Sequence, residues 1–478
     1  MKNLTTTLAL ALVLFYACSP TSKTKQDPTD GDDSTSQIEL SEDQSSVTIP
    51  ANAVAKQINE PLPQVNTKST TYRISPSEEN TVTTENGTTI TVPKNAFVDQ
   101  DGNPIKGDVQ LAFKEFHTAS DVILSGIPMH VTTEDGSLEA FETAGMFEIE
   151  GTDEQGNEVR IANNKTIRVD LATYKDEENY NFYSYDKQEG LWTEEYKNTP
   201  VASNTARAQV VEQLSFFPTP QKPIEIKKAS SNDFVFELAI DRTKNPEFRH
   251  FDNVLWKLKD NTIEDAQLFE KTIRDPNLTC VDRDNSVFQL TGKVGDRKVQ
   301  TRVQPVLFGS NWKKAQAAFN KKLKAFKESV ANKEELEERS KKMAKFQRTL
   351  SVSSFGIYNC DRYLRMKGRR KISFAAVFML PALQKMVKQA FLIIKKRGKN
   401  EAVPLYSGAN GYFIYAPHED NTLITFDDEG NIFEFSNEQF KALTAQNPRA
   451  DKEQTLNFNP TSFSVSSKRD IQAYLDNL

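Results

Sequence analysis

Short strand-like runs separated by tight turns recur along the whole chain, and they constrain its fold more than any other feature. Asn86-Gly87 precedes a β-branched run, and Asp101-Gly102-Asn103 precedes a run of alternating apolar and polar residues from Val109 to Phe116. Asn-Gly and Asp-Gly pairs favour the turns that join antiparallel strands, and such alternation is typical of a half-buried strand. Further hairpin turns are expected around Gly156, Gly295, Arg397–Asn400 and Gly430. We therefore predict a mainly β chain made of multi-domain antiparallel β-sandwiches.

One octamer pattern occurs twice near the start of the chain. Residues 47–54 read VTIPANAV, and residues 90–97 read ITVPKNAF. β-Branched residues favour strands, whereas proline removes a hydrogen-bond donor and fixes φ. Each copy therefore predicts a strand that ends at its proline. The two copies are either related strands or a chance repetition of residues that are common in strands.

The first 18 residues have the features of an export signal. Lys2 provides a positive charge, and the apolar run Leu8–Tyr16 is too short to span a bilayer, which needs about 20 residues. Ala17-Cys18 then resembles the lipobox of bacterial lipoproteins. The resemblance implies that residues 1–17 are a signal peptide and that Cys18 carries the lipid. The alternative is an ordinary cleaved signal in which Cys18 has no such role.

The segment after Cys18 has the composition of a tether. Between Ser19 and Ser46 the only large aliphatic residues are Ile38 and Leu40. So little apolar surface does not offset the entropy lost on ordering the chain. We expect a lipidated flexible stalk over residues 18–66.

A basic region lies inside an otherwise acidic protein. Residues 301–400 contain 25 Lys and Arg against 6 Asp and Glu, whereas residues 1–200 contain 15 against 33. Trp312, Phe319 and Phe326 are seven residues apart, which places them on one face of a helix. The pattern predicts one long basic amphipathic helix between Asn311 and Leu350, or two helices joined near Asn332.

The basic residues of this region are candidates for an anionic-partner patch. They are Lys313, Lys314, Lys321, Lys322, Lys324, Arg369, Arg370 and Lys371. A basic amphipathic helix can lie on an anionic membrane, bind an acidic protein, or pack on a neighbouring sheet with its lysines merely solvated. Nucleic acid is not expected as a partner, because an exported protein rarely meets it.

Two cysteines remain besides Cys18. Cys280 and Cys360 lie in similar settings, LTCVDRD and YNCDRY. An exported compartment permits a disulfide between them, but sequence does not fix their separation. They are either a disulfide or two separate buried thiols.

Motifs that carry catalysis or hold cofactors are missing from the sequence. Its four histidines include no His-Glu-x-x-His, and there is no Cys-x-x-Cys, Gly-x-Ser-x-Gly or P-loop. His117 and His130 could share a sheet with Glu115, although a structural role is the simpler interpretation for both. Tyr185, Trp192 and Tyr196 either form an aromatic surface for glycans or fill a core. We expect no catalytic residues, no metal and no cofactor.

A stretch around the second octamer resembles a known family. GTTITVPKNAF, residues 87–97, is similar to the turn, strand and proline step of ZU5-type β-sandwiches. The continuation KGDVQLAFKEFHTASDVILSGIPM and the hairpin YSYDKQEGLWTEE resemble segments of uncharacterised Bacteroidetes lipoproteins. The resemblance covers residues 72–196 and implies a sandwich used for contact. The self-cleavage known in some ZU5 domains is not implied, because the order here is Phe116-His117-Thr118.

A chain of 478 residues is long enough for about three domains. We expect a ZU5-like sandwich over 67–222, a β region over 223–350 that ends in the basic helix, and a C-terminal sandwich over 351–478 with a short helix from Ser467 to Leu478. The expected function is a non-catalytic binding or scaffolding lipoprotein of the outer membrane, on its periplasmic or surface face. Its partner would be an envelope protein, an anionic lipid or a glycan. The alternatives are a glycan-binding accessory protein and a hydrolase with an unrecognised site.

Overall fold

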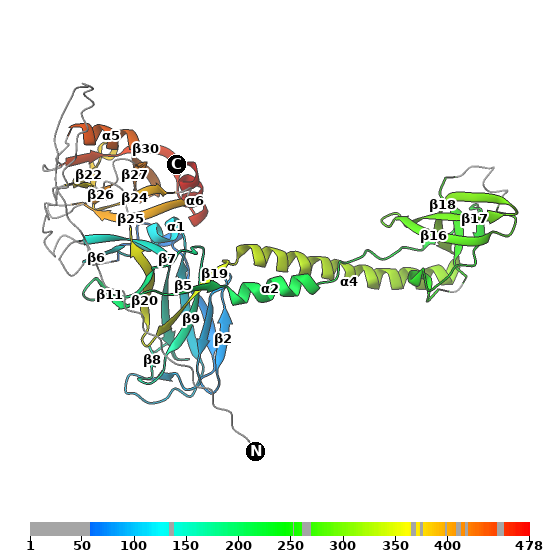
Figure 1. Cartoon of the computed structure of the whole chain (residues 1–478), viewed down its shortest axis with the longest axis horizontal. Helices are drawn as coiled ribbons and strands as arrows, with labels where there is room; N and C mark the ends of the chain where they lie inside the picture. The colour runs from blue at the N-terminus through cyan, green and yellow to red at the C-terminus, as the bar shows by residue number, and fades with distance from the viewer. Residues whose placement is uncertain are drawn as a thin grey trace, which may run out of the picture. The chain divides into compact units, whose positions relative to one another are not determined.

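The computed structural model describes residues 58–132, 138–251, 253–260, 269–364, 370–372, 376–396, 399–407, 413–415, 419–446 and 454–478. The chain is mainly β, with several antiparallel sheets and one long helical insertion, as predicted (Figure 1). The predicted signal peptide, Cys18 and the first octamer lie outside the described residues. Within the described chain, no helix is both long enough and apolar enough to cross a membrane.

Two sheets enclose the first core. The seven-stranded sheet has the order β1-β5-β7-β20-β10-β11, with β6 paired to β7, and consists of β1 (Thr70–Ile74), β5 (Val109–Phe116), β6 (His130–Thr132), β7 (Leu138–Thr152), β10 (Asn181–Asp186), β11 (Leu191–Tyr196) and β20 (Gly356–Tyr363). The five-stranded sheet has the order β12-β19-β9-β3-β2 and consists of β2 (Asn80–Thr83), β3 (Thr89–Val92), β9 (Ile167–Thr173), β12 (Val201–Ser203) and β19 (Phe346–Val352). Phe147 and Leu171 are among the residues buried between the sheets. The short strands β4 (Phe97–Val98) and β8 (Arg160–Ile161) pair beside them.

The second octamer forms the predicted strand and stop. β3 ends at Val92, directly before Pro93, and Asn95 follows with φ of 56°. Asparagine tolerates this left-handed conformation better than most residues, which explains its place after the proline. The turns expected around Gly102, Gly156 and Gly430 share one design. In each, an Asp carboxylate accepts hydrogen bonds from the backbone two and four residues later, as Asp153 does from Gln155 and Asn157 at 2.9 and 2.8 Å.

The expected domain boundaries do not follow the sheets. β19 and β20 follow residue 345, yet they pair with β9, β12, β7 and β10 of the first sandwich. Strand pairing between residues so far apart leaves no local pattern in the sequence, so the expected break at residue 350 falls inside β19. At the other end, Leu62 is 1% exposed within a core cluster, so the packed chain begins before the expected boundary at residue 67.

A six-stranded sheet and the long helix lie between β12 and β19 in the chain. The sheet has the order β14-β15-β18-β17-β16, with β13 parallel to β18, and consists of β13 (Lys227–Lys228), β14 (Val235–Glu237), β15 (Leu255–Leu258), β16 (Arg274–Asp282), β17 (Val287–Val294) and β18 (Arg297–Leu307). Helix α4 runs from Gly309 to Lys342 as one piece. The predicted extension to Leu350 is wrong, because Phe346 and Leu350 belong to β19, where they pair with β9.

The C-terminal part packs a five-stranded sheet and a three-stranded sheet around one core. The first has the order β25-β24-β27-β28-β30 and the second β23-β22-β29, made of β22 (Ala376–Leu380), β23 (Lys385–Val387), β24 (Gln389–Lys396), β25 (Lys399–Tyr406), β27 (Asn421–Phe426), β28 (Asn431–Phe435), β29 (Gln454–Asn457) and β30 (Asn459–Ser464). β21 (Arg370–Ile372) pairs with β26 (Phe413–Tyr415), and helix α5 spans Asn437–Gln446. The predicted terminal helix is α6, Lys468–Asn477, which is capped at Ser467 and buries Ile471, Tyr474 and Leu475. It contacts helix α1, Ala119–Ser125.

Candidate binding groove along helix α4

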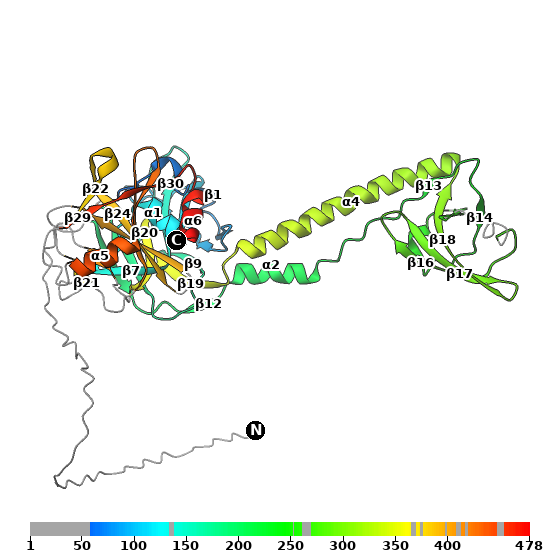
Figure 2. The ribbon, with the colours of Figure 1, turned by 90° about the horizontal axis from the view of Figure 1, so that it is seen from above.

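Residues 204–345 form an insertion in the first sandwich. The chain leaves the five-stranded sheet after β12 and returns to it in β19, where Val201 pairs with Arg348. The backbone N–H of Asn204 donates to the carbonyl of Lys345 at 2.9 Å, which joins the two ends of the insertion. Helix α2, Thr205–Phe216, then packs beside the C-terminal part of α4 (Figure 2).

The apolar stripe of α4 is only partly covered. Ala315 is buried and Trp312 half-buried against the core of the six-stranded sheet. Farther along the helix, Phe319 and Phe326 are half-buried and belong to no core cluster of the described residues. The helix thus uses its first apolar residues for folding and leaves two aromatic rings on a more open surface.

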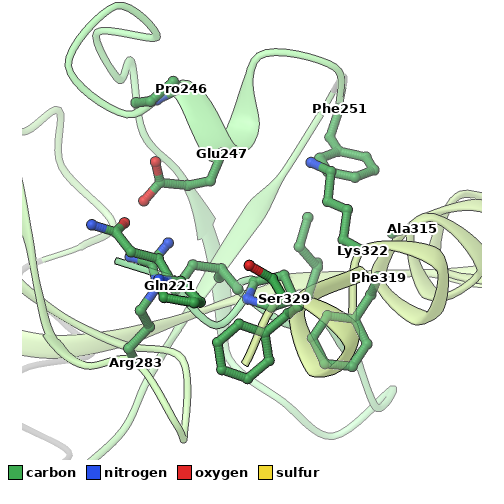
Figure 3. A pocket seen from close by; sticks show the side chains of 14 residues that line it. Gln221, Pro246, Glu247, Phe251, Arg283, Ala315, Phe319, Lys322 and Ser329 are labelled. Carbon is green, nitrogen blue, oxygen red and sulfur yellow. The ribbon is translucent and has the colours of Figure 1, made fainter. Parts of the chain in front are cut away.

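Those rings form one wall of a groove of about 520 Å³ (Figure 3). The opposite walls come from the proline-rich segment 220–226 that leads to β13, from the loop Pro246–Phe251 and from Arg283. Prolines leave few backbone N–H donors, so this segment presents mainly ring surface to the groove. The site is therefore an elongated apolar and aromatic surface with a few charged groups.

Lys322 is the charged residue of α4 that lines the groove. It lies on the wall between Phe319 and Phe326, and Figure 3 shows it extending toward Phe251. Its side chain is exposed, and it forms no ion pair with any residue that the structure describes. Across the groove, Arg283 donates to the carbonyl of Lys222, and Glu247 supplies one carboxylate.

The lysines of α4 are concentrated in its N-terminal half. Residues 309–327 contain six lysines and no acidic residue, and the first turn contains no acid. Positive charge near a helix N-terminus is unfavourable, because the helix dipole is positive there. This effect falls off beyond the first turn, so it acts mainly on Lys313 and Lys314. Lys324 pairs with Glu328, and an anionic partner would reduce the mutual repulsion of the other lysines.

The predicted anionic-partner patch divides into separate surfaces. A period of 3.6 residues places Lys313, Lys314, Lys321 and Lys324 on the face of α4 away from the apolar stripe, and all four are exposed. Lys322 alone of the five lysines lines the groove. The backbone of Arg370 and Lys371 lies in β21, and Arg369 lies outside the described residues.

The other walls of the groove were not predicted. Pro220, Pro223, Phe251 and Arg283 are far from α4 in the sequence, and nothing in the local pattern connects them to it. The available signal was the spacing of three prolines, Pro218, Pro220 and Pro223, directly before a basic strand. Such spacing indicates an extended segment without pointing to the element it faces.

Both cysteines are free thiols in the structure, which contradicts the disulfide interpretation. Cys360 is fully buried on β20 in the core of the first sandwich. Cys280 is on β16 and packs against the separate core of the six-stranded sheet. The two strands belong to different sheets and do not pair, so the similar sequence settings do not bring the thiols together.

Two of the aromatic residues considered for glycan binding fill a core. Tyr185 and Trp192 are each 6% exposed, and the Trp192 indole N–H donates to the carbonyl of Pro128 at 2.6 Å. Tyr196 is 37% exposed and packs on Phe182. The exposed aromatic platform that a glycan site requires is therefore not formed by these three residues.

Comparison of the chain with protein-family models, with curated proteins and with solved structures gives no match. Within the described residues, no three His, Cys, Asp or Glu side chains form a metal-binding group. The groove along α4 is thus the site on which a functional proposal is built.

Proposed function

We propose that this protein is a non-catalytic cell-envelope lipoprotein that binds an acidic segment of a partner protein in the groove along α4. The observation that carries the proposal is Lys322, which forms no ion pair with any described residue and lies on the same wall of the groove as two half-buried aromatic rings. Fully packed aromatics would indicate a core, and a lone lysine would indicate a solvated face. Together they favour a ligand with apolar groups on either side of a carboxylate.

The spacing of the rings fits an extended peptide. Phe319 and Phe326 are seven residues apart on α4, which corresponds to about 10.5 Å along the helix axis. In a polyproline-II peptide, which has three residues per turn and rises about 3.1 Å per residue, residues i and i+3 lie on the same face about 9 Å apart. Two apolar side chains at that spacing, with an acidic residue between them, would contact both rings and Lys322.

The position of Lys322 inside a groove favours an acidic protein segment over a membrane surface or a glycan. A membrane surface would engage Lys313, Lys314, Lys321 and Lys324, but it would not enter a groove walled by prolines. A glycan would require exposed aromatic faces. The lipid anchor at Cys18 and the tether that follows it support a location at the envelope, where a tethered module holds another component.

The binding proposal is tested with fluorescent ten-residue peptides that carry two leucines three residues apart. One peptide has aspartates between and beside the leucines, and its matched form has lysines instead. With the full chain carrying Cys18→Ser, we expect anisotropy to show binding of the acidic peptide only. Lys322→Glu should weaken that binding at least tenfold, and the adjacent outward-facing Lys321→Glu should change it less than twofold.

The same proteins are then mixed with vesicles of phosphatidylglycerol or of phosphatidylcholine. Anionic vesicle binding that is lost in Lys321→Glu but kept in Lys322→Glu would replace the peptide proposal with a membrane surface. Equal binding of the acidic and basic peptides would also overturn it.

The lipoprotein part of the proposal has a separate test. Cells expressing the protein are fractionated, and Cys18→Ala is compared with the wild type. We expect Cys18→Ala to leave the membrane fraction. Retention of the variant in that fraction would contradict lipid anchoring without affecting the groove. Protease treatment of intact cells then distinguishes the surface face from the periplasmic face.

A further inference from the structure

A second cavity, of about 340 Å³, lies away from the groove along α4. His117, Tyr174 and Lys175 come to it from the first sandwich, Glu401 from β25, and Gln472 and Asp476 from α6. Phe141, Met129 and Val122 supply an apolar wall. This volume is within the range of small-molecule sites, and such sites commonly combine an apolar lining with a few placed polar groups.

His117 has an unsatisfied nitrogen at this cavity. Its side chain is 5% exposed, and its Nε2 lies 3.2 Å from Oε1 of Glu115. Burial alone would raise the pKa of Glu115, but the hydrogen bonds from His117, Thr88 and Thr84 outweigh it and lower the pKa. An ionised carboxylate only accepts hydrogen bonds, so Nε2 of His117 donates to Glu115. In the neutral imidazole with that tautomer, Nδ1 is an acceptor.

Nδ1 of His117 is buried without a hydrogen-bond partner among the described residues. Gly145, with φ of 149°, lies against it, and a Cβ at that position would be 3.3 Å from Nδ1. A side chain at position 145 would press on this edge of the ring and on Leu171. Buried polar atoms nearly always have a partner, so an orphaned acceptor beside a cavity points to a ligand that donates a hydrogen bond.

The charged residues of the wall favour a cation. Glu401 and Asp476 supply two carboxylates against the single ammonium group of Lys175. Lys175 already pairs with Glu401 and with Glu142, the latter at 3.2 Å. The aromatic residues Phe141 and Tyr174 also line the cavity, and aromatic rings attract cations. Donor groups and positive charge are therefore accommodated better than a carboxylate.

We propose that this cavity binds a small amphipathic amine, whose ammonium group donates a hydrogen bond to Nδ1 of His117 and whose apolar body packs on Phe141, Met129 and Val122. Binding needs no chemistry on the ligand and does not depend on the groove along α4. It would make the protein a receptor for a small molecule as well as for a protein segment.

The test compares three probes with the same apolar body and different head groups: 2-phenylethylamine, 2-phenylethanol and phenylacetate. Calorimetry on the full chain carrying Cys18→Ser should show that the amine binds at least tenfold more tightly than the alcohol, with no binding of phenylacetate. The imidazole ¹⁵N spectrum should show a shift of Nδ1 of His117 when the amine is added.

Two variants and one control complete the test. His117→Phe keeps an aromatic ring but removes the acceptor, and Ala119→Leu fills the cavity from its rim without touching the polar groups. Each should reduce amine binding at least tenfold, whereas His250→Phe, at an exposed position in the insertion, should leave it unchanged. Tighter binding of phenylacetate than of the amine, or no binding of any probe to the folded wild type, would overturn the proposal.

Discussion

The first sandwich and the insertion differ in where their charged side chains lie and in whether the fold provides partners for them. In the sandwich, Arg348 is completely buried, donates to the carbonyls of Thr199 and Glu177 at 2.7 and 2.5 Å, and stacks on Tyr180 at 4.7 Å. In the insertion, the lysines of the first half of α4 are exposed, and apart from Lys324 they form no ion pair with described residues. The sandwich therefore uses charge to fix its own fold, whereas the insertion presents charge that its own fold does not satisfy.

The aromatic residues follow the same division. Phe147 is fully buried in the sandwich and stacks between Phe113 and Tyr358 at centroid distances of 5.3 and 5.4 Å. Phe326 is half-buried on α4 and lines the groove. One ring is a structural element and the other is part of a surface, and their truncation should distinguish the two roles.

The largest expected effect is the destabilisation caused by truncating Phe147. Phe147→Ala should lower the free energy of unfolding by about 3–5 kcal/mol, because it removes a buried ring and leaves a cavity. Phe326→Ala should lower it by less than about 1 kcal/mol, because the ring is already partly in water. Urea unfolding followed by circular dichroism measures both variants. Similar costs for the two would show that Phe326 belongs to a core and would remove the basis for the groove.

The second-largest loss of stability is expected from mutation of a buried ion-pair cluster in the first sandwich. Lys175 bridges Glu142 and Glu401, and Arg362 also contacts Glu142 at 2.7 Å. Lys175→Met should cost about 3 kcal/mol, because it removes the buried ammonium group that joins the two carboxylates, while Arg362 still pairs with Glu142. Lys187→Met is the matched surface control. Lys187 is 47% exposed and pairs with Glu148 and Glu150, so its loss should cost under about 1 kcal/mol.

The pH dependence of that cluster has a defined sign. Burial disfavours the charge of Lys175, but Glu401 and Glu142 outweigh it and raise its pKa above 10.5. The stabilisation by Lys175 is therefore fully present below pH 10.5 and is lost only as the pH rises through the folded-state value. If Lys175→Met cost no more than Lys187→Met at pH 7, the contrast between buried and exposed charge within the sandwich would be wrong.

Asp361 tests whether every buried ionisable group of the sandwich has partners that compensate its charge. It is completely buried, its Oδ1 has no partner among the described residues, and burial raises its pKa well above 3.8. A carboxyl with a raised folded-state pKa contributes stability that is present below pH 3.8 and is lost as the pH rises through the folded value. The loss amounts to about 1.4 kcal/mol for each pH unit within that window.

Asp361→Asn keeps the shape and removes the ionisation. Urea unfolding is measured at several pH values between roughly 3.5 and 8, which extend from the ordinary range of a carboxyl group to well above it. The free energy of unfolding of the wild type should fall as the pH rises, and that of the variant should not. The variant should then be the more stable protein at neutral pH. Parallel pH profiles would mean that Asp361 is ionised and compensated in the folded chain.

The sequence predicted what is local in this molecule and missed what is not. The spacing of Trp312, Phe319 and Phe326 identified α4, and the Asp and Gly residues identified the turns, because each depends on neighbours in the chain. The return of the chain through β19 and β20 was missed, because both strands pair with partners more than 140 residues earlier. Pairing of that kind depends on which faces meet, and strand propensity alone does not encode it.

The candidate site shows the same limit. Lys322 was predicted as one of eight basic residues, and only its position on α4 relative to Phe319 and Phe326 distinguishes it from Lys321. The walls that turn those residues into a groove come from segments 220–226 and 246–251. At the second cavity, the sequence did allow one contact: His117 follows the end of β5 and hydrogen-bonds to Glu115, two positions earlier.

Substitution of the two cysteines, one in the sandwich and one in the insertion, should have the smallest effect on the free energy of unfolding. Cys360 is buried beside Thr199 Oγ1 at 3.0 Å, and burial raises its pKa to about 12. Cys280 is half-buried on β16 of the insertion. Cys280→Ser should change the free energy of unfolding by less than about 0.5 kcal/mol, whereas Cys360→Ser should cost about 1–2 kcal/mol, because it buries a more polar group.

Thiol labelling separates the same two positions without mutation. In the folded protein, maleimide should modify Cys280 and leave Cys360 untouched, and unfolding without reductant should expose both, as peptide mass spectrometry would show. Loss of both labels in the unfolded, unreduced chain would mean that the exported protein joins the two cysteines. The insertion would then be tied covalently to the sandwich, and the division of roles between a structural region and a binding region would not hold.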